Sequence, residues 1–271
     1  IQQAIGSILS IHQDGDEIII VDDGSTDGTV DYLAELSVAN EKVRYFSNVI
    51  SEGACAARNK AILAAKGAFV SGLDDDDEFT HDRIEKLLSA YDDKYSFVTS
   101  AQWWDHGKRR TLLGGKEQLI TFNDQLNQNF ATNQVLVKKQ KIIEAGLFDV
   151  DFPACQDWEM WTRLTQKFGV ALKIASPTYI IHAGHNEPRI TFSTNRINGF
   201  ELYYQRYSSY MNKANKVAFQ LKLIEAKKTP LSFSLGVRLF SLHSYKKVIK
   251  LWLISYFPFL QKLKKKYMSG K

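Results

Sequence analysis

The sequence has little cysteine, with only Cys55 and Cys155 among its 271 residues. The two lie far apart and not at the spacing of metal ligands, which argues against a disulfide framework and against a zinc site. So few cysteines fit a reducing compartment. The first residues also lack the basic stretch of a signal peptide and have the apolar spacing of an amphipathic helix. We therefore expect a cytoplasmic protein.

The sequence also lacks a hydrophobic run that could span a membrane, because the apolar stretch Leu251–Leu260 is shorter than the roughly 20 residues required. The surrounding region, Ala226–Lys271, has 11 lysines and arginines and no aspartate or glutamate, whereas the rest of the chain has 24 basic and 30 acidic residues. Basic segments rich in aromatic residues lie in the plane of the membrane interface. This tail is therefore predicted to dock peripherally on the anionic inner face of the cytoplasmic membrane. The alternative is a helix that packs on the body with its lysines in water, and the acidic body disfavours nucleic acid as a partner.

A run of four aspartates, Asp74–Asp77, ends a short apolar stretch, Ala68–Leu73. The pattern predicts a buried strand that delivers a carboxylate cluster to the edge of a sheet. Adjacent carboxylates raise each other's pKa unless a cation lies among them, and their hard oxygen atoms suit Mg²⁺, Ca²⁺ or Mn²⁺. An EF-hand is excluded because Phe79 stands where its loop needs glycine. The alternative is an acidic turn exposed to solvent.

Strand and helix patterns alternate in the first part of the chain, which predicts an α/β fold with an open, mostly parallel sheet flanked by helices. Such sheets bind ligands at the carboxyl ends of their strands. Asp22 and Asp23 lie at one such end and Asp74–Asp77 at another, so we expect the two acidic turns to share one crevice. The predicted strands here are Ile18–Val21, Val43–Phe46 and Ala68–Leu73, and the predicted helices are Thr29–Leu36 and Gly53–Ala65.

The later part of the chain has a mixed pattern and then becomes helical. Helix Gln156–Phe168 opens with an acidic residue, and Pro230 separates helix Glu201–Lys227 from another that starts near Ser232. The remaining predicted elements are the strands Ser96–Ser100, Gln134–Val137 and Ala171–Ile181, and the helix Lys139–Ala145.

Five motifs follow one another in the order of a known family. Together they resemble glycosyltransferase family 2, whose members are inverting enzymes with the Rossmann-like GT-A fold. The resemblance covers residues 1–191 approximately, and the family's first strand is absent from this sequence, so we expect a strand to precede Ile1. The motifs are VDDGSTDGT (21–29), EGACAARNKAI (52–62), AKGAFVSGLDDDDEFTHDRI (65–84), GLFD (146–149) and QDWEMWTRL (156–164).

The resemblance implies a domain organisation. Residues 1–195 would form the GT-A catalytic domain, with a nucleotide-binding half at 1–102 and an acceptor half at 103–195. Residues 196–271 would form a helical, basic C-terminal extension that the resemblance does not cover.

The resemblance also implies roles for the residues of the first acidic motifs. Asp23 would accept a hydrogen bond from the uracil N3–H of a UDP-sugar, and Arg58 would lie near the base or the diphosphate. Asp74 and Asp75 would lie near the ribose and the metal. Asp76 would be the main ligand of a divalent cation, Mn²⁺ or Mg²⁺. Of these, Arg58 has the alternative of pairing with a surface acid.

Two further roles are implied by the later motifs. Asp157 would be the general base that deprotonates the acceptor hydroxyl, although Gln156 replaces the glutamate that usually precedes it. His182 would lie close to the diphosphate or the metal. The alternatives are that Asp157 caps the helix that it opens and that His182 is structural.

These features predict a metal-dependent inverting glycosyltransferase. It would transfer a sugar from a UDP-sugar to a hydroxyl of a glycan, and the acceptor that we expect is a lipid-linked oligosaccharide of bacterial surface polysaccharide synthesis, such as O-antigen or capsule. One alternative is a sugar-1-phosphate nucleotidyltransferase, for which no glycine-rich loop with a basic residue is found. The other is a non-catalytic protein that binds nucleotide sugars.

Overall fold

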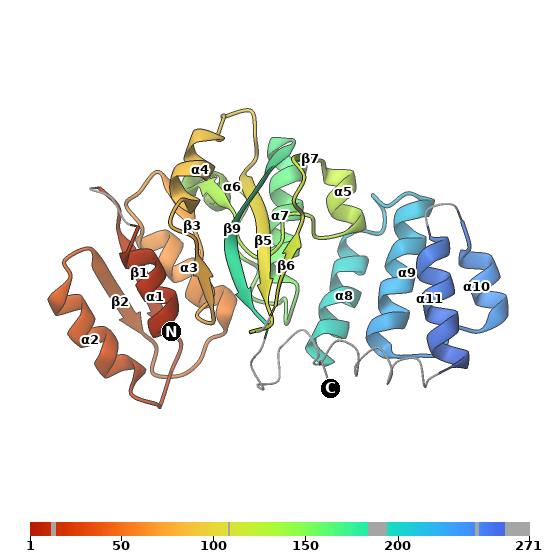
Figure 1. The fold of residues 1–271 in the computed structure, drawn as a ribbon, viewed down its shortest axis with the longest axis horizontal. Coiled ribbons are helices and arrows are strands. Elements are labelled where there is room, and N and C mark those ends of the chain that lie inside the picture. The colour runs from red at the N-terminus through yellow and green to blue at the C-terminus, as the bar shows by residue number, and fades with distance from the viewer. Residues whose placement is uncertain (12–14, 108, 184–193, 242–243, 258–271) are drawn as a thin grey trace. The chain divides into compact units, whose positions relative to one another are not determined.

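The computed structural model describes residues 1–11, 15–107, 109–183, 194–241 and 244–257. The chain divides into two units (Figure 1). Unit 1 comprises Ile1–Phe152 and Gln156–Glu187, and contains the strands. Unit 2 comprises Pro153–Cys155 and Pro188–Lys271, and its described part is helical.

The first strands of unit 1 form a two-stranded parallel sheet in which Ile18 lies opposite Val43 and Asp22 opposite Ser47. A helix follows each strand, so the alternation predicted from the sequence is confirmed in this part. The residue before the second helix, Gly53, has a φ of 90°, which glycine adopts without the steric cost of a Cβ atom. The elements are β1 (Ile18–Asp22), α2 (Thr29–Ala39), β2 (Val43–Ser47) and α3 (Ala54–Ala64).

Within the described residues, the larger sheet has seven strands in the order β3-β8-β5-β9-β4, with β6 paired to β5 and β7 to β9. Its two longest strands, β5 and β9, lie side by side and parallel in the centre of unit 1 (Figure 1). The strands are β3 (Phe69–Ser71), β4 (Asp77–Phe79), β5 (Val98–Asp105), β6 (Arg110–Leu113), β7 (Gln118–Ile120), β8 (Leu136–Lys138) and β9 (Ala171–His182).

The prediction of a mostly parallel sheet is wrong for the described strands. In the larger sheet only β5 and β9 pair in parallel, whereas β3–β8, β5–β8, β4–β9, β5–β6 and β7–β9 are antiparallel. The alternation of strand and helix stops after β3, since only the acidic turn separates β3 from β4. The apolar pattern of a strand also does not encode the direction in which a distant segment returns to pair with it.

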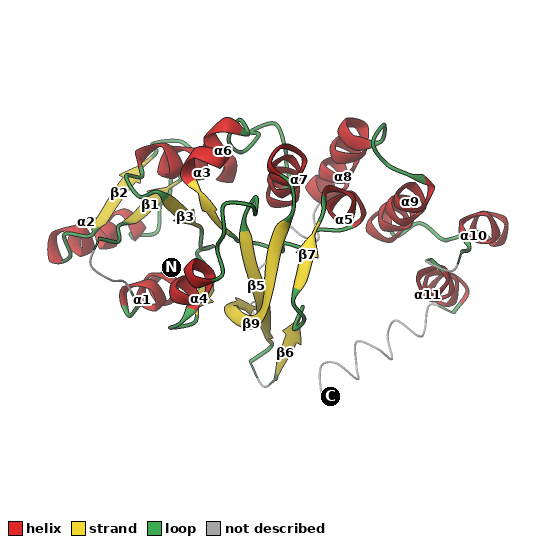
Figure 2. Ribbon diagram, turned by 90° about the horizontal axis from the view of Figure 1, so that it is seen from above, coloured by secondary structure: helices red, strands yellow, loops and turns green. Residues whose placement is uncertain are grey.

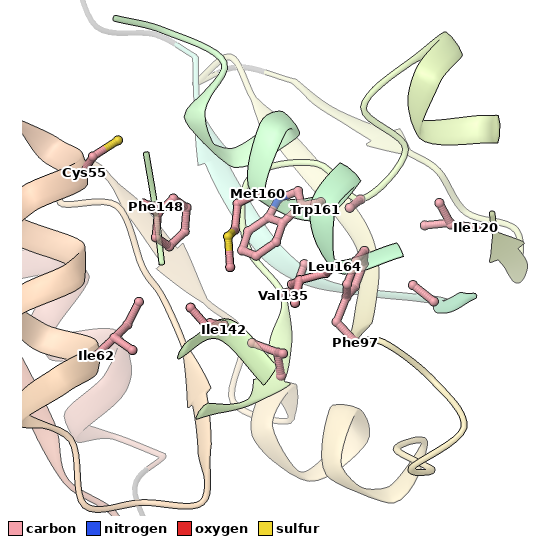
Figure 3. Packing of buried hydrophobic residues seen from close by; sticks show 13 residues of the cluster. Cys55, Ile62, Phe97, Ile120, Val135, Ile142, Phe148, Met160, Trp161 and Leu164 are labelled. Atoms are coloured by element: carbon pink, nitrogen blue, oxygen red, sulfur yellow. The ribbon is translucent and has the colours of Figure 1, made fainter. Parts of the chain in front are cut away.

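The main core of unit 1 lies under α7, whose apolar residues recur at helical spacing. Met160, Trp161 and Leu164 are buried, and the Trp161 ring lies 5.7 Å from the rings of both Phe97 and Phe148 (Figure 3). Replacing such an aromatic residue by alanine costs about 3–5 kcal/mol. This packing fixes the first turn of α7. The other helices of unit 1 are α1 (Gln2–Leu9), α4 (Arg83–Ser89), α5 (Phe122–Asn127), α6 (Lys139–Glu144) and α7 (Gln156–Phe168).

Unit 2 consists of helices in its described part (Figure 2). The prediction of one helix over Glu201–Lys227 is wrong, because the chain breaks before Asn212. The side chain of Asn212 caps a new helix by accepting from the backbone N–H of Asn215. The side chain of Asn215 accepts in turn from the backbone N–H of Asn212. The helices are α8 (Thr194–Tyr207), α9 (Lys213–Lys227), α10 (Phe233–Leu239) and α11 (Tyr245–Tyr256).

The last residues of the predicted membrane-binding tail, 258–271, lie outside the described residues. Among the helices that are described, none has both the length and the apolar character needed to cross a membrane.

Candidate functional site

The first acidic turn follows β1 and is organised around the Asp23 carboxylate. Its Oδ1 accepts from Asn48 Nδ2 and the Glu52 backbone N–H, both at 2.9 Å. Its Oδ2 accepts from Ser51 Oγ at 2.7 Å and from the Gly53 backbone N–H at 2.8 Å. Partial burial raises the pKa of Asp23, but these hydrogen bonds outweigh burial and hold the pKa at about 2. Asp23 is therefore a permanently charged acceptor that orders the loop before α3.

The neighbouring Asp22 has a structural role within the turn. Its buried carboxylate accepts from Ser47 Oγ at 3.0 Å and from the Ser25 backbone N–H at 3.3 Å. The two adjacent aspartates thus have different tasks. Asp22 ties the turn to β2, and Asp23 ties it to the loop that leads into α3.

The second acidic turn, between β3 and β4, contains Asp74, which is paired with Arg58 of α3. The Arg58 Nη2 donates to Asp74 Oδ1 at 3.0 Å. Gln134 Nε2 donates to the same oxygen at 2.9 Å, and Asn133 Nδ2 to the other at 3.4 Å. Asp74 therefore joins α3, the acidic turn and the loop before β8.

The next two aspartates, Asp75 and Asp76, are exposed, whereas Asp77 is buried and begins β4. Burial, together with the negative charges of Asp74 and Asp76, raises the pKa of Asp77 to about 7. The Asp77 Oδ1 accepts from the His182 backbone N–H at 3.2 Å. Asp77 was not among the predicted site residues, although its place in the aspartate run was a signal that could have found it.

His182 ends β9 and lies beside the acidic turn. Its Nε2 contacts Glu78 Oε1, and Gln3 of α1 also donates to that carboxylate. The antiparallel pairing of β4 with β9, with Asp77 opposite Ile181, brings these groups together. The structure thus places the predicted His182 at the end of the aspartate run, in contact with Asp77 and Glu78, neither of which was among the predicted site residues.

A buried arginine supports the second turn from beneath. Arg83 is fully buried, with its guanidinium 4.6 Å from the centre of the Phe79 ring and 5.1 Å from that of Tyr179. It donates to Thr178 Oγ1 at 3.0 Å. The hydroxyl of Tyr179 in turn accepts from the Asp74 backbone N–H at 3.3 Å. Arg83 was not among the predicted site residues, because the burial of a charged side chain is not visible in a helical pattern.

Asp157 lies in the first turn of α7. Removal of water from its carboxyl group raises its pKa, the hydrogen bond from the Trp158 backbone and the positive charge of Arg58 oppose this, and the pKa is about 6. Its Oδ2 accepts from Asn129 Nδ2 at 2.9 Å. The charges of Arg58 and Asp74 both act on Asp157, which lies near their ion pair.

The loop before β8 donates hydrogen bonds to the carboxylates of both Asp157 and Asp74. Asn129 Oδ1 accepts from the Thr132 backbone N–H at 3.1 Å, and the Thr132 carbonyl accepts from Trp161 Nε1 at 3.0 Å. Thr132 has a φ of 68°, a conformation that is strained for a β-branched residue. Asn129 thereby faces Asp157, while Asn133, one residue beyond Thr132, reaches Asp74. The sequence did not identify this loop as functional.

The first turn is connected to the same helix, α3. Asn48 donates to Asp23 and accepts from Lys60 Nζ at 2.7 Å, and Lys60 lies on α3 as does Arg58. The two acidic turns are therefore linked through one helix that pairs with both.

No three histidine, cysteine, aspartate or glutamate side chains form a ready cation site among the residues that the structure describes. The exposed carboxylates of Asp75 and Asp76 nevertheless have the hard oxygen donors that Mg²⁺ and Mn²⁺ take. Mg²⁺ is commonly held by one or two carboxylates together with substrate phosphates and water. These two residues fit a cation that would arrive with a diphosphate.

Comparisons with known proteins bear on the family of this chain and on its fold. The sequence model described as "Glycosyl transferase family 2" matches residues 1–145. The putative colanic acid biosynthesis glycosyl transferase WcaA of Escherichia coli K12 is 30% identical over 225 residues, which cover 79% of this chain and 78% of WcaA. The UDP-Glc:alpha-D-GlcNAc-diphosphoundecaprenol beta-1,3-glucosyltransferase WfaP of Escherichia coli is 26% identical over 192 residues, which cover 68% of this chain and 73% of WfaP.

A solved structure shares the fold. The crystal structure of Staphylococcus aureus TarS 1-349 in complex with UDP matches with a TM-score of 0.61 at 14% identity, covering 100% of this chain and 88% of that one. At this identity the likeness concerns the fold alone.

Proposed function

Because this chain belongs to glycosyltransferase family 2 and has the GT-A fold, as its motifs predicted, we propose that it transfers a sugar from a UDP-sugar to a hydroxyl of a glycan with inversion of the anomeric configuration. The observation that carries the proposal is the carboxyl group of Asp157, with a pKa of about 6, beside the Arg58–Asp74 ion pair. A base with this pKa is largely ionised at pH 7 and still basic enough to accept a proton.

The proposed donor is a UDP-sugar, and Asp23 is its proposed recognition residue. The uracil ring offers the imide N3–H, a donor that an ionised carboxylate accepts well. The Asp23 carboxylate accepts from four donors of the protein. The exposed Ser51 hydroxyl can rotate away most easily, so the imide would take its place. The fold shared with TarS, whose structure contains UDP, supports this donor.

The proposed cofactor is a divalent cation, Mn²⁺ or Mg²⁺, held by Asp76 with Asp75 next to it. When bound, it would neutralise the negative charge of the departing diphosphate. Arg58, paired with Asp74, and His182, at the end of β9, would face the same diphosphate with their own donors. The buried Asp77 accepts from the His182 backbone N–H and so helps to hold the end of β9 at this turn.

The proposed base, Asp157, would accept the proton of the acceptor hydroxyl as the oxygen attacks the anomeric carbon. One displacement by the acceptor inverts the configuration, so no carboxylate nucleophile is required. Asn129 holds the Asp157 carboxylate in one orientation, and the packing of Trp161 under α7 fixes the helix that carries it.

The proposed acceptor is a lipid-linked oligosaccharide of bacterial surface polysaccharide synthesis, such as O-antigen or capsule. The names of two relatives support it: WcaA is assigned to colanic acid biosynthesis, and the name of WfaP gives a sugar linked to diphosphoundecaprenol. A lipid-linked acceptor lies in the membrane, so the enzyme would have to act at the membrane surface. The basic C-terminal extension is proposed to associate it peripherally with the cytoplasmic membrane.

The test is a screen of UDP- and GDP-sugars for slow hydrolysis and for transfer, with Mn²⁺ or Mg²⁺ and with a chelator. We expect release of UDP from one UDP-sugar, and loss of release with the chelator. Release of pyrophosphate in place of UDP would contradict the proposal, and so would a preference for GDP-sugars. If the chelator has no effect, the proposed divalent cation is contradicted, but the proposed sugar transfer is not.

A further inference from the structure

Unit 2 exposes large apolar side chains on two neighbouring helices, α10 and α11, and on the residue that follows each helix. They are between 39% and 66% exposed, whereas apolar side chains of this size are usually covered in a monomer when they occur together. They are Phe233, Val237, Phe240, Tyr245, Ile249, Leu253, Tyr256 and Phe257. We call this set the α10–α11 face.

The α10–α11 face is continuous along and across the helices. On α11, Tyr245, Ile249 and Leu253 follow one another at intervals of four residues and form one stripe. Ring contacts join the two helices at both ends. Phe233 stacks on Trp252 with ring centres 5.2 Å apart, and the rings of Phe240 and Tyr245 are 6.5 Å apart.

None of these side chains belongs to the buried core in which α11 packs. Another side of α11, with Val248 and Leu251, packs in a separate core with Leu221 of α9 and Leu231. The helix α11 is thus apolar on two sides, of which one is covered within the unit. A second apolar side on a surface helix indicates a surface that is covered by something else.

The positive charge around the α10–α11 face indicates what kind of surface covers it. Arg238 and Lys246 are exposed on the same two helices, and no aspartate or glutamate occurs from Ala226 onward. Glu225 of α9 is paired with Lys247 at 3.0 Å and with Lys250 at 2.6 Å, both on α11. Two copies of this face would bring basic residues together, which opposes self-association. A surface that is apolar and anionic at once matches both properties.

We propose that the α10–α11 face inserts its aromatic and aliphatic side chains into the interfacial region of a bilayer that contains anionic lipid, with Arg238 and Lys246 on the headgroups. This inference deepens the peripheral association proposed above by assigning it to named side chains of unit 2. Apolar burial provides the binding free energy, and the cations make it dependent on lipid charge and on salt.

The test is co-sedimentation of the full chain with vesicles of phosphatidylcholine, with or without phosphatidylglycerol. We expect binding to the anionic vesicles that weakens with salt and is at least tenfold weaker to the neutral ones. Ile249→Ser with Leu253→Ser should weaken binding at least tenfold, and Arg238→Glu with Lys246→Glu should abolish the preference for anionic lipid. Val38→Ser with Val49→Ser, which alters exposed valines of unit 1, is the matched control and should bind as the parent does.

Equal binding of the parent and the Ile249→Ser, Leu253→Ser variant would overturn the proposal. So would a dimer in light scattering that the same variant dissociates, because the face would then join two copies. Thermal unfolding shows whether each variant is folded, and Tyr256→Ser at the edge of the face provides a milder second variant with the same direction of effect. UDP release from a UDP-sugar, measured without vesicles, tests the proposed function separately and should be unchanged in all these variants.

Discussion

The turn of Asp23 and the first turn of α7 both present a carboxylate, and the structure treats the two in opposite ways. Asp23 receives four hydrogen bonds and has a pKa of about 2. Asp157 receives one from a side chain, is half-buried, and has a pKa of about 6, raised by the removal of water from its carboxyl group. Both residues are aspartates, so the difference in pKa comes from the hydrogen-bond donors and the water around each carboxyl group.

This difference separates binding from proton transfer. A carboxylate held at a low pKa keeps its charge at every physiological pH and is suited to accept from a ligand N–H. A carboxylate raised toward neutrality can accept and release a proton, as a general base must. If the comparison holds, changes at Asp23 alter the affinity for the donor, and changes at Asp157 alter the rate of transfer.

The largest effect is expected for Asp157→Asn. Asparagine keeps the size and can still contact Asn129, but it cannot accept a proton, so kcat should fall by about 10² to 10⁴-fold with the KM for the donor nearly unchanged. The measurement is steady-state UDP release with donor and acceptor varied separately. Asp151→Asn, at an exposed position in the loop before α7, removes the same charge and should behave as the parent does.

Turnover of Asp157→Asn at more than a third of the parent rate would break the comparison. It would mean that Asp157 serves only the start of α7, the alternative that the sequence left open. A rise in the donor KM with kcat unchanged would instead assign it to binding.

The next effect is expected for Asp23→Ala. The variant leaves the backbone N–H groups of Glu52 and Gly53 without their acceptor and removes the acceptor for the base, which together cost about 1–3 kcal/mol. The donor KM should therefore rise about 5- to 150-fold with a smaller change in kcat. Binding of UDP measured by calorimetry checks this directly, with Asp31→Ala, an exposed residue of α2, as the control. Unchanged UDP affinity would show that Asp23 only orders its own loop.

The sequence allowed Asp23 and Asp157 to be named, because each lies in a motif placed just after a strand or at the start of a helix. It also predicted β1, β2 and α7, whose apolar patterns are long enough to set the type of element. It did not reveal the partners that create the difference in pKa. Ser51, Gly53 and Asn129 come from distant loops, and such contacts depend on how the chain returns rather than on local spacing.

The same limit explains the errors in the fold. The alternation in the first part of the chain was extended to a mostly parallel sheet, whereas β8 and β9 return in directions that their own residues do not encode. The break before Asn212 was missed because the apolar pattern continues across it, although Asn212 and Asn215 form a capping pair at the start of α9. Arg83 was not singled out in the sequence, because a helical pattern does not show that a charged side chain is fully buried.

Asn129→Ala is expected to change the pH dependence more than the maximal rate. Loss of the hydrogen bond from Asn129 removes an interaction that favours the ionised form, so the pKa of Asp157 rises above its present value of about 6. The acidic limb of the kcat profile should then move to higher pH, with activity near that of the parent at the alkaline end. A rate profile from pH 5 to 9 checks this, and Asn127→Ala, in the preceding helix α5, is the control. An equal loss at every pH would indicate a structural role alone.

The smallest effect is expected for Ser51→Ala, which removes one of the four donors to Asp23. Loss of this donor raises the pKa of Asp23 from about 2, yet three donors remain and the group stays charged near neutral pH. The exposed Ser51 hydroxyl is the hydrogen-bond donor that a uracil imide would replace. Its removal should therefore change the KM for the UDP-sugar by less than about threefold, which corresponds to less free energy than one typical hydrogen bond left unmade. Asn48→Ala, which also breaks the link to Lys60 of α3, should raise the donor KM more. Comparing UDP affinity of the two variants measures this, and a rise for Ser51→Ala as large as that for Asp23→Ala would mean that the hydroxyl itself binds the nucleotide.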